Sequence, residues 1–369
     1  MKVLHAGKFY APVKGGIETV LAALCEGAAG RWDVRAVVAN EGRQTVRERR
    51  HGVSIVRVGT LARALSVSLS PGLARELWRE PVDCVVLHEP NPLVGTLLAI
   101  HRPARRLVVW HHSDIVRPAW ANPTYGRLQR ALYRRADCVI VAAPPLAEHS
   151  AAVRGSRRIE VIPYGIAGDG LETTTLDPAG AVGRALARLP EPLVLYVGRL
   201  VYYKGLDVLL QALARTRGGL AIVGEGPLDA ALRRQIVALG LGERVAMLGG
   251  CTDDEVRGLY QGCDVFVLPS TARTEAFGLV QAEAMINGLP VISTDLPTGV
   301  PWVNEHGVTG LVVPPGDVTA LAAALERLLA DPPLRAKLGD AARARARERF
   351  TQTRMVEHFI DVVESVVRG

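Results

Sequence analysis

The sequence has no apolar run long enough to cross a membrane. One of its longest runs, LVGTLLAI at residues 93–100, falls well short of the roughly 20 residues that a transmembrane helix needs. The first ten residues, MKVLHAGKFY, begin a strand-like pattern and contain neither the apolar core nor the cleavage site of a secretion signal. We therefore expect a cytoplasmic protein.

Cysteine and aromatic residues are both scarce. Five cysteines, with no Cys-x-x-Cys pair, suit neither a disulfide scaffold nor a zinc site. Cys84, Cys138 and Cys263 lie in or beside apolar runs, as small core residues do. The segments CTDDEV and HHSD lack a second ligand cluster, so we expect no metal. Aromatic residues make up 5% of the chain and are too scattered for the stacking surface of a nucleic-acid binder.

Charge is divided unevenly along the chain. Residues 1–165 carry 24 Lys and Arg against 13 Asp and Glu, a balance of +11, whereas residues 166–369 carry 20 against 24, a balance of −4. A basic first half indicates an anionic partner, such as a phosphorylated substrate or an anionic membrane. A generally arginine-rich composition is the alternative.

Short β-branched runs alternate with helical patterns through the whole chain, which predicts parallel sheets with helices on both faces. At 369 residues the chain is too long for one core, so two domains are expected. The strands predicted in the first half are Lys2–Ala6, Val34–Ala39, Ser54–Val58, Asp83–His88, Arg106–His111, Asp137–Ala142 and Ile159–Ile162. Those predicted in the second half are Leu193–Val197, Leu220–Val223, Arg244–Leu248, Asp264–Leu268, Pro290–Ser293 and Gly310–Val313.

A break in this alternation sets the domain boundaries. Residues 164–183 are rich in Gly, Asp and Thr and have no apolar period, as in a linker. We predict an N-terminal Rossmann-like domain over residues 1–165, a linker over 166–190 and a second Rossmann-like domain over 191–350. A last helix, within residues 351–369, is expected to pack back on the first domain. Sheets of this kind bind ligands at the carboxyl ends of their strands.

Two segments carry the residue types of a phosphate site. In GKFYAPVKGGIE, Gly15 and Gly16 precede a helix, where paired glycines let a phosphate approach the backbone. A dinucleotide-binding site, with Glu41 on a ribose, is the rival, but G-x-G-x-x-G is absent; a plain turn is the other alternative. In VGRLVYYKG, Arg199 and Lys204 follow a strand and could stabilise the charge on a departing diphosphate, or be solvated surface charges.

The segment TARTEAFGLVQAEAMINGLPVIST places two carboxylates across a helix start. If the helix begins near Gly278, the free amides of residues 277–280 suit a phosphate. Glu275, outside the helix, could accept from sugar hydroxyls, and Glu283, inside it, from both hydroxyls of a ribose. The alternatives are a helix-capping carboxylate for Glu275 and a surface helix residue for Glu283.

Four motifs in this order resemble the retaining glycosyltransferases of family 4, which have the GT-B fold. EAFGLVQAE is similar to that family's E-x7-E motif, VGRLVYYKG to its GR-x(n)-KG segment, VGEGP to its V-G-[DE]-G-P, and GGIE to its N-terminal glycine loop. The resemblance covers nearly the whole chain. It implies two Rossmann-like domains facing a cleft and metal-independent transfer of a hexose with retention of configuration, without a cofactor beyond the nucleotide sugar.

The resemblance also implies roles for individual residues. Arg199 and Lys204 would hold the diphosphate, Glu283 the ribose, and Gly15 and Gly16 would approach the phosphate. The donor sugar would be oriented by Glu275 and by the backbone from Ala276 through Phe277 and Gly278 to Leu279. Cys251 and Asp253, the latter in the loop after the strand RVAMLGG, would lie at the base. His112 would donate to a sugar hydroxyl or to the phosphate, unless it is a packing residue at a strand end. Asp114 would bind acceptor or sugar.

HHSDIVRP and VGRLVYYKG look most like bacterial mannosyltransferases of polysaccharide and O-antigen assembly, which use GDP-mannose. A carboxylate at Asp253 can accept from the N1–H and N2–H groups of guanine, so GDP-mannose is favoured over UDP-sugars. An epimerase or phosphorylase on the same plan is the further alternative.

In the resembling family the first half binds the acceptor, which is a lipid diphosphate at the inner membrane face in many members. Basic groups that could meet anionic headgroups are Arg127, Arg130 and Arg134 at helical spacing, and Arg43, Arg47, Arg49 and Arg50. Solvated surface charges are the alternative.

Overall fold

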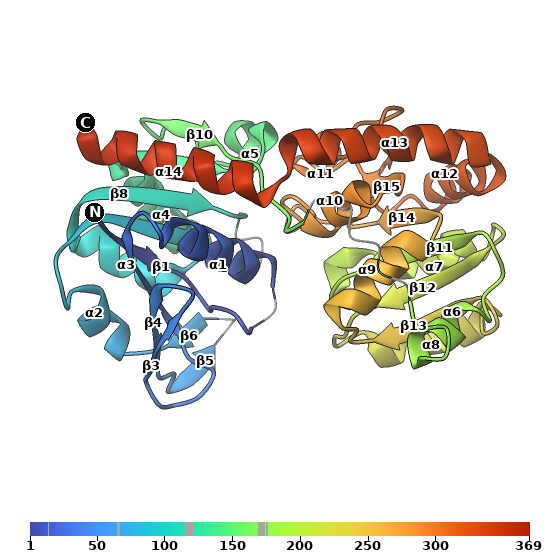
Figure 1. The fold of residues 1–369 in the computed structure, drawn as a ribbon, viewed down its shortest axis with the longest axis horizontal. Coiled ribbons are helices and arrows are strands. Elements are labelled where there is room, and N and C mark those ends of the chain that lie inside the picture. Colours follow the sequence, from blue (N-terminus) through green and yellow to red (C-terminus); the bar gives the residue numbers. More distant parts are fainter. Residues whose placement is uncertain (14, 65–66, 115–121, 169–173, 175) are drawn as a thin grey trace. The chain divides into compact units, whose positions relative to one another are not determined.

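The structure of the chain is a computed structural model that describes residues 1–13, 15–64, 67–114, 122–168, 174 and 176–369. Its contacts divide the chain into two units, one of Met1–Gly165 with Gln352–Gly369 and one of Ile166–Thr351 (Figure 1). Each unit is a Rossmann-like sheet with helices on both faces, which confirms the predicted fold class. The two units are described separately.

The N-terminal unit contains an eight-stranded sheet in the order β10-β9-β8-β7-β1-β2-β4-β3. All pairs are parallel except β3 with β4. The strands are β1 Lys2–Ala6, β2 Asp33–Ala39, β3 Val46–Arg50, β4 Val53–Val58, β7 Val82–Glu89, β8 Ala104–His111, β9 Cys138–Val141 and β10 Ile159–Val161, with a separate ribbon of β5 Ala62–Ala64 and β6 Val67–Leu69. The strand order reverses between β1 and β7, which makes this the topological switch point.

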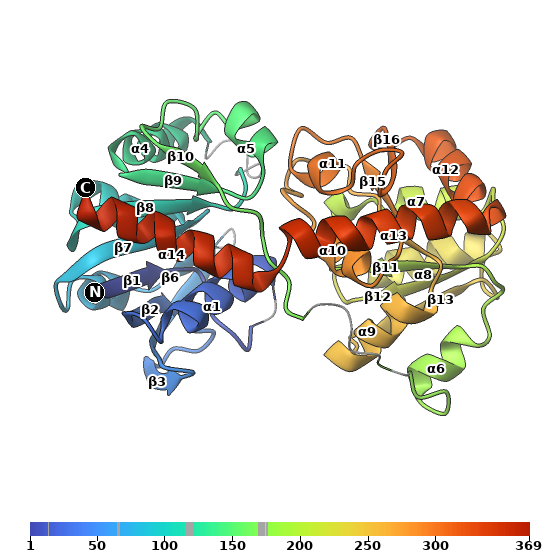
Figure 2. The ribbon, with the colours of Figure 1, turned by 45° about the horizontal axis from the view of Figure 1, so that its top comes forward.

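The helices of this unit are α1 Gly16–Ala28, α2 Gly72–Leu77, α3 Pro92–Ile100, α4 Asn122–Arg135, α5 Pro144–His149 and α14 Gln352–Arg368. Helices α1 and α14 lie side by side over one face of the sheet (Figure 2). Helix α14 buries an apolar stripe at helical spacing that includes Met355, Phe359, Val363 and Val366, the pattern of a helix that covers a core. The N-terminal sheet is therefore closed on this face by the helix that follows the C-terminal unit in the sequence.

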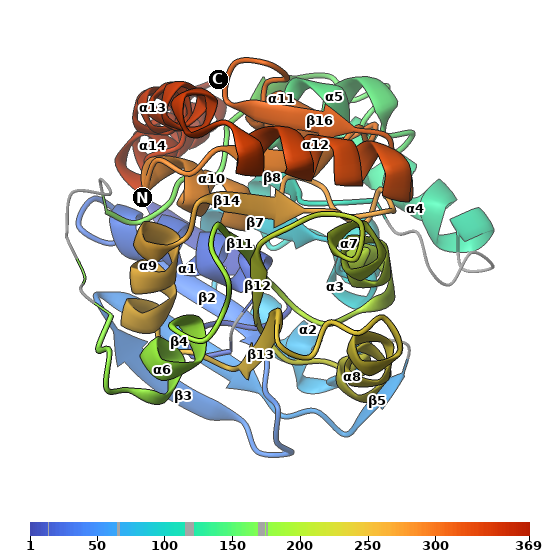
Figure 3. The ribbon, with the colours of Figure 1, turned by 90° about the vertical axis from the view of Figure 1, so that its right-hand side faces the viewer.

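The C-terminal unit contains a six-stranded parallel sheet in the order β13-β12-β11-β14-β15-β16. Its strands are β11 Leu193–Val197, β12 Gly219–Val223, β13 Val245–Gly249, β14 Val265–Leu268, β15 Val291–Thr294 and β16 Gly310–Val313. Its helices are α6 Ala181–Leu186, the 3₁₀ turn η2 Tyr202–Lys204, α7 Leu206–Leu213, α8 Asp229–Ala238, α9 Asp253–Gly262, α10 Leu279–Ile286, α11 Val300–Val303, α12 Val318–Ala330 and α13 Pro332–Arg349. Helices α7 and α8 lie on one side of the strands, and α9 and α10 on the other (Figure 3).

Five elements differ from the sequence prediction: β3, β5, β6, α6 and α13. Strand β3 was missed because all five of its residues are exposed and read as a basic cluster. The ribbon of β5 and β6 is too short to show an alternation. Helix α13 was not predicted, because its apolar pattern is weak: the residues that it buries are mainly small, namely Gly339, Ala342 and Ala346. The segment predicted as a linker, residues 166–190, contains helix α6, while residues 169–173 and 175 lie outside the described residues.

Close packing between β15 and β16 requires a glycine at position 310. A Cβ atom added there would lie 1.9 Å from the carbonyl oxygen of Val291 and 2.6 Å from Oδ1 of Asn304. Neither neighbour can move freely, because Val291 is in the sheet and Asn304 is fully buried. At Gly242, by contrast, no described atom lies within 4 Å of an added Cβ.

We expect Gly310→Ala to lower the free energy of unfolding of the C-terminal unit by about 3 kcal/mol, because the strands must separate to admit the methyl group. The control, Gly242→Ala, should change it by less than about 0.5 kcal/mol. Urea unfolding measures both. Equal stability of the two variants would show that the β15–β16 contact is not as close as the structure has it.

Candidate functional site

Three of the predicted donor residues, Arg199, Lys204 and Glu275, lie at the switch point of the C-terminal sheet. The strand order reverses between β11 and β14, and ligands of such sheets bind beyond the carboxyl ends of the strands at this place. The segment after β11 contains Arg199 and Lys204, and the segment after β14 contains Glu275. Because the two strands are parallel neighbours, both segments leave the sheet at the same edge.

A buried ion pair joins these two segments. The Nζ atom of Lys204 lies 2.6 Å from Oε2 of Glu275, and Oγ of Ser270 donates to the same oxygen at 3.0 Å. Lys204 and Glu275 are 8% and 9% exposed, so each charge depends on the other. Arg199 lies in the same segment as Lys204 and is exposed. The alternative of two solvated cations therefore does not hold for Lys204.

Helix α10 begins beside this pair. Its N-cap is Gly278, in the left-handed conformation (φ 70°, ψ 63°) and with no side-chain capping bond, so Glu275 is not the helix cap. A Cβ at Gly278 would also lie 2.4 Å from Cδ2 of Leu268. Ala276 and Phe277 are buried, while Leu279 is half-buried. The free amides at this helix start favour an anion.

The second carboxylate of the motif, Glu283, lies on α10 beside a buried tyrosine. The hydroxyl of Tyr260 donates to Oε2 of Glu283 at 2.9 Å. Burial raises the pKa of Glu283, the Tyr260 hydroxyl lowers it, and the charge of Asp253 raises it. Glu283 is therefore not an ordinary surface residue, and Asp253 lies near enough to act on it.

Asp253 is the first residue of α9 rather than part of a loop. The helix has a capping box, in which the Thr252 hydroxyl accepts from the amide of Glu255 and the Glu255 carboxylate accepts from the amide of Thr252. Cys251, which precedes the cap, is half-buried, and burial raises the pKa of its thiol. The predicted base residues thus follow β13, two strands from the switch point.

The predicted glycine pair lies at the start of α1 in the N-terminal unit. Gly15 is the N-cap, in extended backbone (φ 172°, ψ 152°), which any residue can adopt. A Cβ on Gly16 would have no described atom within 4 Å. Neither backbone conformation nor packing requires a glycine at position 16. That this glycine leaves space for a ligand stays a prediction.

His112, predicted to touch the substrate, lies just beyond β8 and is 2% exposed. Its Nε2 lies 2.9 Å from Nδ1 of His88, and its Nδ1 lies 2.6 Å from the hydroxyl of Tyr164. His88 in turn lies 3.1 Å from His5, from Nε2 to Nδ1. Both ring nitrogens of His112 are thus engaged within the protein. Donation to a sugar stays a prediction, and it requires one of these partners to be displaced.

Asp114, the predicted acceptor residue, accepts from the hydroxyl of Ser150 at 2.6 Å and lies 3.4 Å from Nε2 of His111. His111 also contacts the hydroxyl of Tyr133, at 2.9 Å from its Nδ1. The remainder of HHSDIVRP, residues 115–118, lies outside the described residues.

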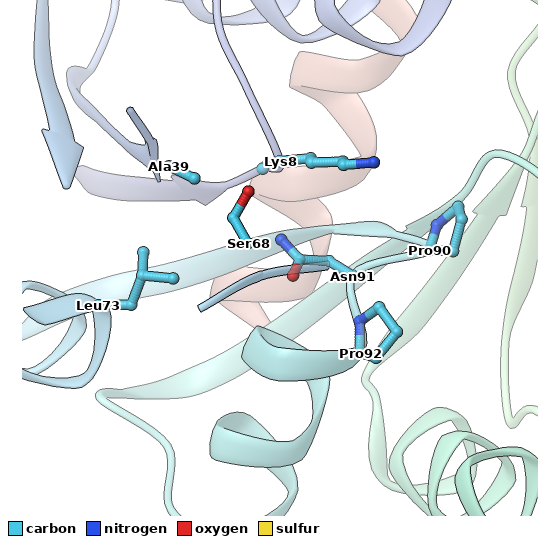
Figure 4. A pocket seen from close by; sticks show the side chains of 8 residues that line it. Lys8, Ala39, Ser68, Leu73, Pro90, Asn91 and Pro92 are labelled. Atoms are coloured by element: carbon cyan, nitrogen blue, oxygen red, sulfur yellow. The ribbon is translucent and has the colours of Figure 1, made fainter. Parts of the chain in front are cut away.

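A small pocket opens at the carboxyl ends of β1, β2 and β7 (Figure 4). It is lined by Gly7, Lys8, Ala39, Ser68, Leu73, Pro90, Asn91 and Pro92. Ser68 is 7% exposed, and its Oγ has no hydrogen-bond partner among the described residues. In Figure 4 this oxygen points toward Lys8. A buried hydroxyl without a partner is costly, and a polar ligand in this pocket would satisfy it.

The sequence prediction did not include several residues that contact the predicted site residues. Ser270 and Tyr260 hold the two glutamates, and His88, His5 and Tyr164 hold His112. His5 and His88 could have been recognised from the sequence together with His112, because all three lie at or near the ends of apolar runs, in VLHA, VLHE and VVWHH. Within the described residues, no group of three or more His, Cys, Asp or Glu has metal-binding geometry, and no helix is long and apolar enough to span a membrane.

Comparison with known proteins matches both halves of the chain. Residues 15–165 match the family model "Glycosyl transferase 4-like domain", and residues 184–345 match "Glycosyl transferases group 1". The O-antigen chain mannosyltransferase C of Escherichia coli is 30% identical over 379 residues, covering 100% of both chains. The chain belongs to the family 4 glycosyltransferases of GT-B type.

Other relatives of this glycosyltransferase are named for different activities. The D-rhamnosyltransferase WbpZ of Pseudomonas aeruginosa is 36% identical, over 95% of this chain and 92% of its own. The GDP-mannose-dependent alpha-(1-6)-phosphatidylinositol monomannoside mannosyltransferase of Mycolicibacterium smegmatis is 30% identical, over 90% and 91%. The Anabaena protein Alr3699/HepE, solved with UDP and glucose, superposes with a TM-score of 0.80 at 24% identity, over 99% and 100%, and so has the same fold.

We expect Lys204→Met to lower the stability of the glycosyltransferase's C-terminal unit by roughly 3–5 kcal/mol, because it leaves the Glu275 carboxylate buried without a counter-charge. Adding Glu275→Met should restore most of the loss, since both charges are then gone. The control is Arg233→Met, which breaks an exposed pair with Asp229 and should cost less than about 1 kcal/mol. Urea unfolding distinguishes these cases; equal losses in Lys204→Met and the control would contradict the buried pair.

Acid should destabilise the N-terminal unit through its buried histidines. Burial lowers the pKa of His5 and of His112 from 6.5 to about 3. Below pH 6.5 the unfolded chain therefore binds more protons than the folded protein. The contribution of each histidine to the free energy of unfolding is complete above pH 6.5 and is lost as the pH falls toward 3. At pH 5 each group should cost on the order of 2 kcal/mol.

Burial raises the pKa of Glu89 and Glu283, so protonation of these carboxyls favours the folded protein as the pH falls. The pH dependence of the wild type therefore contains two opposite effects, and the measurement compares variants to separate them. His5→Leu should lose about 2 kcal/mol less than the wild type between pH 7.5 and pH 5. The exposed His358→Leu should lose as much as the wild type. Equal losses in all three proteins would mean that His5 is not held neutral by burial.

Proposed function

We propose that this glycosyltransferase moves mannose from GDP-mannose onto a hydroxyl of a lipid-linked glycan, with retention of configuration and without a metal ion. The main support for the position of the donor site is the Lys204–Glu275 pair at the switch point, next to the start of α10. A diphosphate there can bind Lys204, Arg199 and the free amides of the helix start. Glu275 is then placed to accept from the sugar.

The nucleoside would lie along α9 and α10. The charge of Asp253 contributes to the raised pKa of Glu283, and in the proposed arrangement a ribose on Glu283 has its base toward Asp253. The carboxylate of Asp253 can accept from two N–H groups of guanine, which uracil lacks. Mannosyl transfer in the names of two relatives supports this donor. A rhamnosyl donor is the second candidate, because the relative at 36% identity is a D-rhamnosyltransferase.

In the proposed reaction the bond between the anomeric carbon and the diphosphate oxygen breaks, and a bond to the acceptor oxygen forms on the same face. The acceptor's proton passes to the leaving phosphate. Negative charge therefore grows on the phosphate, where Lys204, Arg199 and the helix amides stabilise it. In this mechanism the two glutamates bind the donor, and neither forms a covalent intermediate with the sugar.

The acceptor is proposed to bind the N-terminal unit, at the pocket of Lys8, Ser68 and Asn91. The hydroxyl of Ser68, which has no hydrogen-bond partner among the described residues, supports a polar ligand there. Helix α4 presents Arg127 and Arg134 to solvent, with Arg130 half-buried between them. These cations could bind the headgroups of an anionic membrane and keep the protein near a lipid-linked acceptor.

The donor assignment predicts a selective thermal shift in buffer that contains EDTA. GDP should raise the melting temperature more than UDP, because a ligand that binds only the folded state stabilises it. In Asp253→Asn the affinity for GDP should fall about tenfold, since a charged acceptor is lost, while the affinity for UDP stays the same. The matched control is Asp254→Asn, whose carboxylate is exposed beside Arg257.

A larger shift with UDP would reject GDP-mannose and keep the glycosyltransferase. A GDP shift that appears only when a divalent ion is added would reject metal independence of donor binding. Equal effects of Asp253→Asn and Asp254→Asn would reject the role of Asp253 at the base. With GDP-mannose and a lipid-linked acceptor, the anomeric configuration of the product, read by NMR, tests retention.

A further inference from the structure

The loop between β1 and α1 connects the small pocket to the glycine pair. It starts at Gly7 and Lys8, which line the pocket, and ends at Gly15, the N-cap of α1. None of its described residues belongs to a helix or a strand. The amide of Val13 donates to the carbonyl oxygen of Tyr10 at 3.2 Å, which closes a turn. Contacts with side chains from other elements therefore decide how firmly this loop is held.

One side chain, that of Arg57 in β4, holds this turn. Its Nη1 donates to the carbonyl oxygen of Tyr10 at 3.0 Å, and its Nη2 donates to the carbonyl oxygen of Ala11. The guanidinium also lies over the Tyr10 ring, 5.9 Å from the ring centroid, within the range of a cation–π interaction. Tyr10 is fully buried, so a single cation contacts both its backbone and its ring.

Arg57 is held in turn by Glu48 in β3. The Oε1 atom of Glu48 accepts from Nε of Arg57 at 2.8 Å and from Nη2 at 2.7 Å. A guanidinium has five N–H groups, and these bonds use four of them, two on the carboxylate and two on the loop. An exposed ion pair would contribute little, but the Arg57 side chain is only 12% exposed. Removing a partner therefore leaves a largely buried charged group without its hydrogen bonds.

This contact gives strand β3 a purpose. All five of its residues are exposed, so the strand adds no apolar side chain to the core. It pairs antiparallel with β4, with Val46 opposite Arg57 and Glu48 opposite Ile55. Glu48 is thus the diagonal neighbour of Arg57 on one face, within reach of a long side chain. The strand brings a carboxylate to the arginine that holds the loop.

The tethered turn lies close to the glycine pair along the chain. Ala11 is four residues before Gly15, and four residue steps reach about 14 Å at most. The bonds from Arg57 therefore limit the positions that are open to the segment leading into α1.

We propose that Arg57 and Glu48 are positioning residues for the transfer reaction, which hold the turn Tyr10–Val13 and thereby keep Gly15 and Gly16 where the ligand binds. The functional part of this inference rests on the proposed sugar transfer and on the predicted approach of the two glycines to the phosphate. The tether itself depends on neither.

Hydrogen–deuterium exchange tests the tether without any substrate. In Arg57→Met the amide of Val13 should exchange roughly tenfold faster than in the wild type, because the turn opens more often without the cation that holds it. Glu48→Met should also speed this exchange. Adding Glu48→Met to Arg57→Met should have no further effect, since Glu48 acts through Arg57.

The control is Arg158→Met, which removes an arginine bonded to Glu160 and Ser365. Glu160 lies in β10, at the opposite edge of the sheet from β3, so the exchange of the loop should stay as in the wild type. Unchanged exchange in Arg57→Met would overturn the proposal. An equal increase in Arg158→Met would also overturn it, because the effect would then be a general loss of stability.

Turnover tests the functional part, as release of GDP from GDP-mannose per folded molecule in the presence of a lipid-linked acceptor. Arg57→Met should lower kcat roughly tenfold, with less effect on the KM for the donor, because the charge on the phosphate is greatest in the transition state. Arg57→Lys keeps the charge but lacks the planar fork, so its kcat should fall between those of Arg57→Met and the wild type. Arg158→Met should match the wild type.

An Arg57→Met protein with faster exchange but an unchanged kcat would show that the tether is structural, and the positioning role would fail. If this variant does not fold, Arg57→Lys and Glu48→Gln, which keep most of the side chain, decide both measurements. If the wild type uses another nucleotide sugar but not GDP-mannose, the proposed donor fails, and the same comparison of kcat is made with that sugar. The exchange experiment decides the tether in every case.

Discussion

In a parallel sheet all strands end at the same edge, and the site of the C-terminal unit depends on this constraint. Lys204 and Glu275 are 71 positions apart in the sequence, yet they lie 2.6 Å from each other because β11 and β14 are neighbours where the strand order reverses. The left-handed turn at Gly278 then starts α10 at the same edge. A cation, a carboxylate and a helix start are brought together by topology.

The two units use the same architecture with different electrostatics. At its switch point the C-terminal sheet holds a charged pair and a helix dipole, which suit a ligand with negative charge. The N-terminal sheet instead places neutral imidazoles along three neighbouring strands, β1, β7 and β8, and they end at His112. Neutral imidazoles can donate hydrogen bonds to hydroxyl groups or accept them, without attracting ions. This division suits a reaction between an anionic donor and a hydroxyl-bearing acceptor.

The sequence was informative where one local signal was strong. The strands Lys2–Ala6, Leu193–Val197 and Gly310–Val313 have the predicted bounds, since buried β-branched runs between turns have few other interpretations. Contacts between distant residues could not be predicted. Ser270 on Glu275, Tyr260 on Glu283 and His88 on His112 follow from which strands are neighbours and in which register. One sequence contains neither piece of information.

Helix α14 follows the C-terminal unit in the sequence but completes the core of the N-terminal unit, where Phe359 packs against His5 and Trp110. During synthesis the N-terminal sheet therefore leaves the ribosome with part of one apolar face uncovered, namely the part beside α1 that α14 later covers. It stays so until all of Ile166–Thr351 has been made. Domains usually fold in order of their synthesis, but here the core of the first is complete only after the second has been made. For the same reason, an exchange of N-terminal units between family members must carry both segments of the chain.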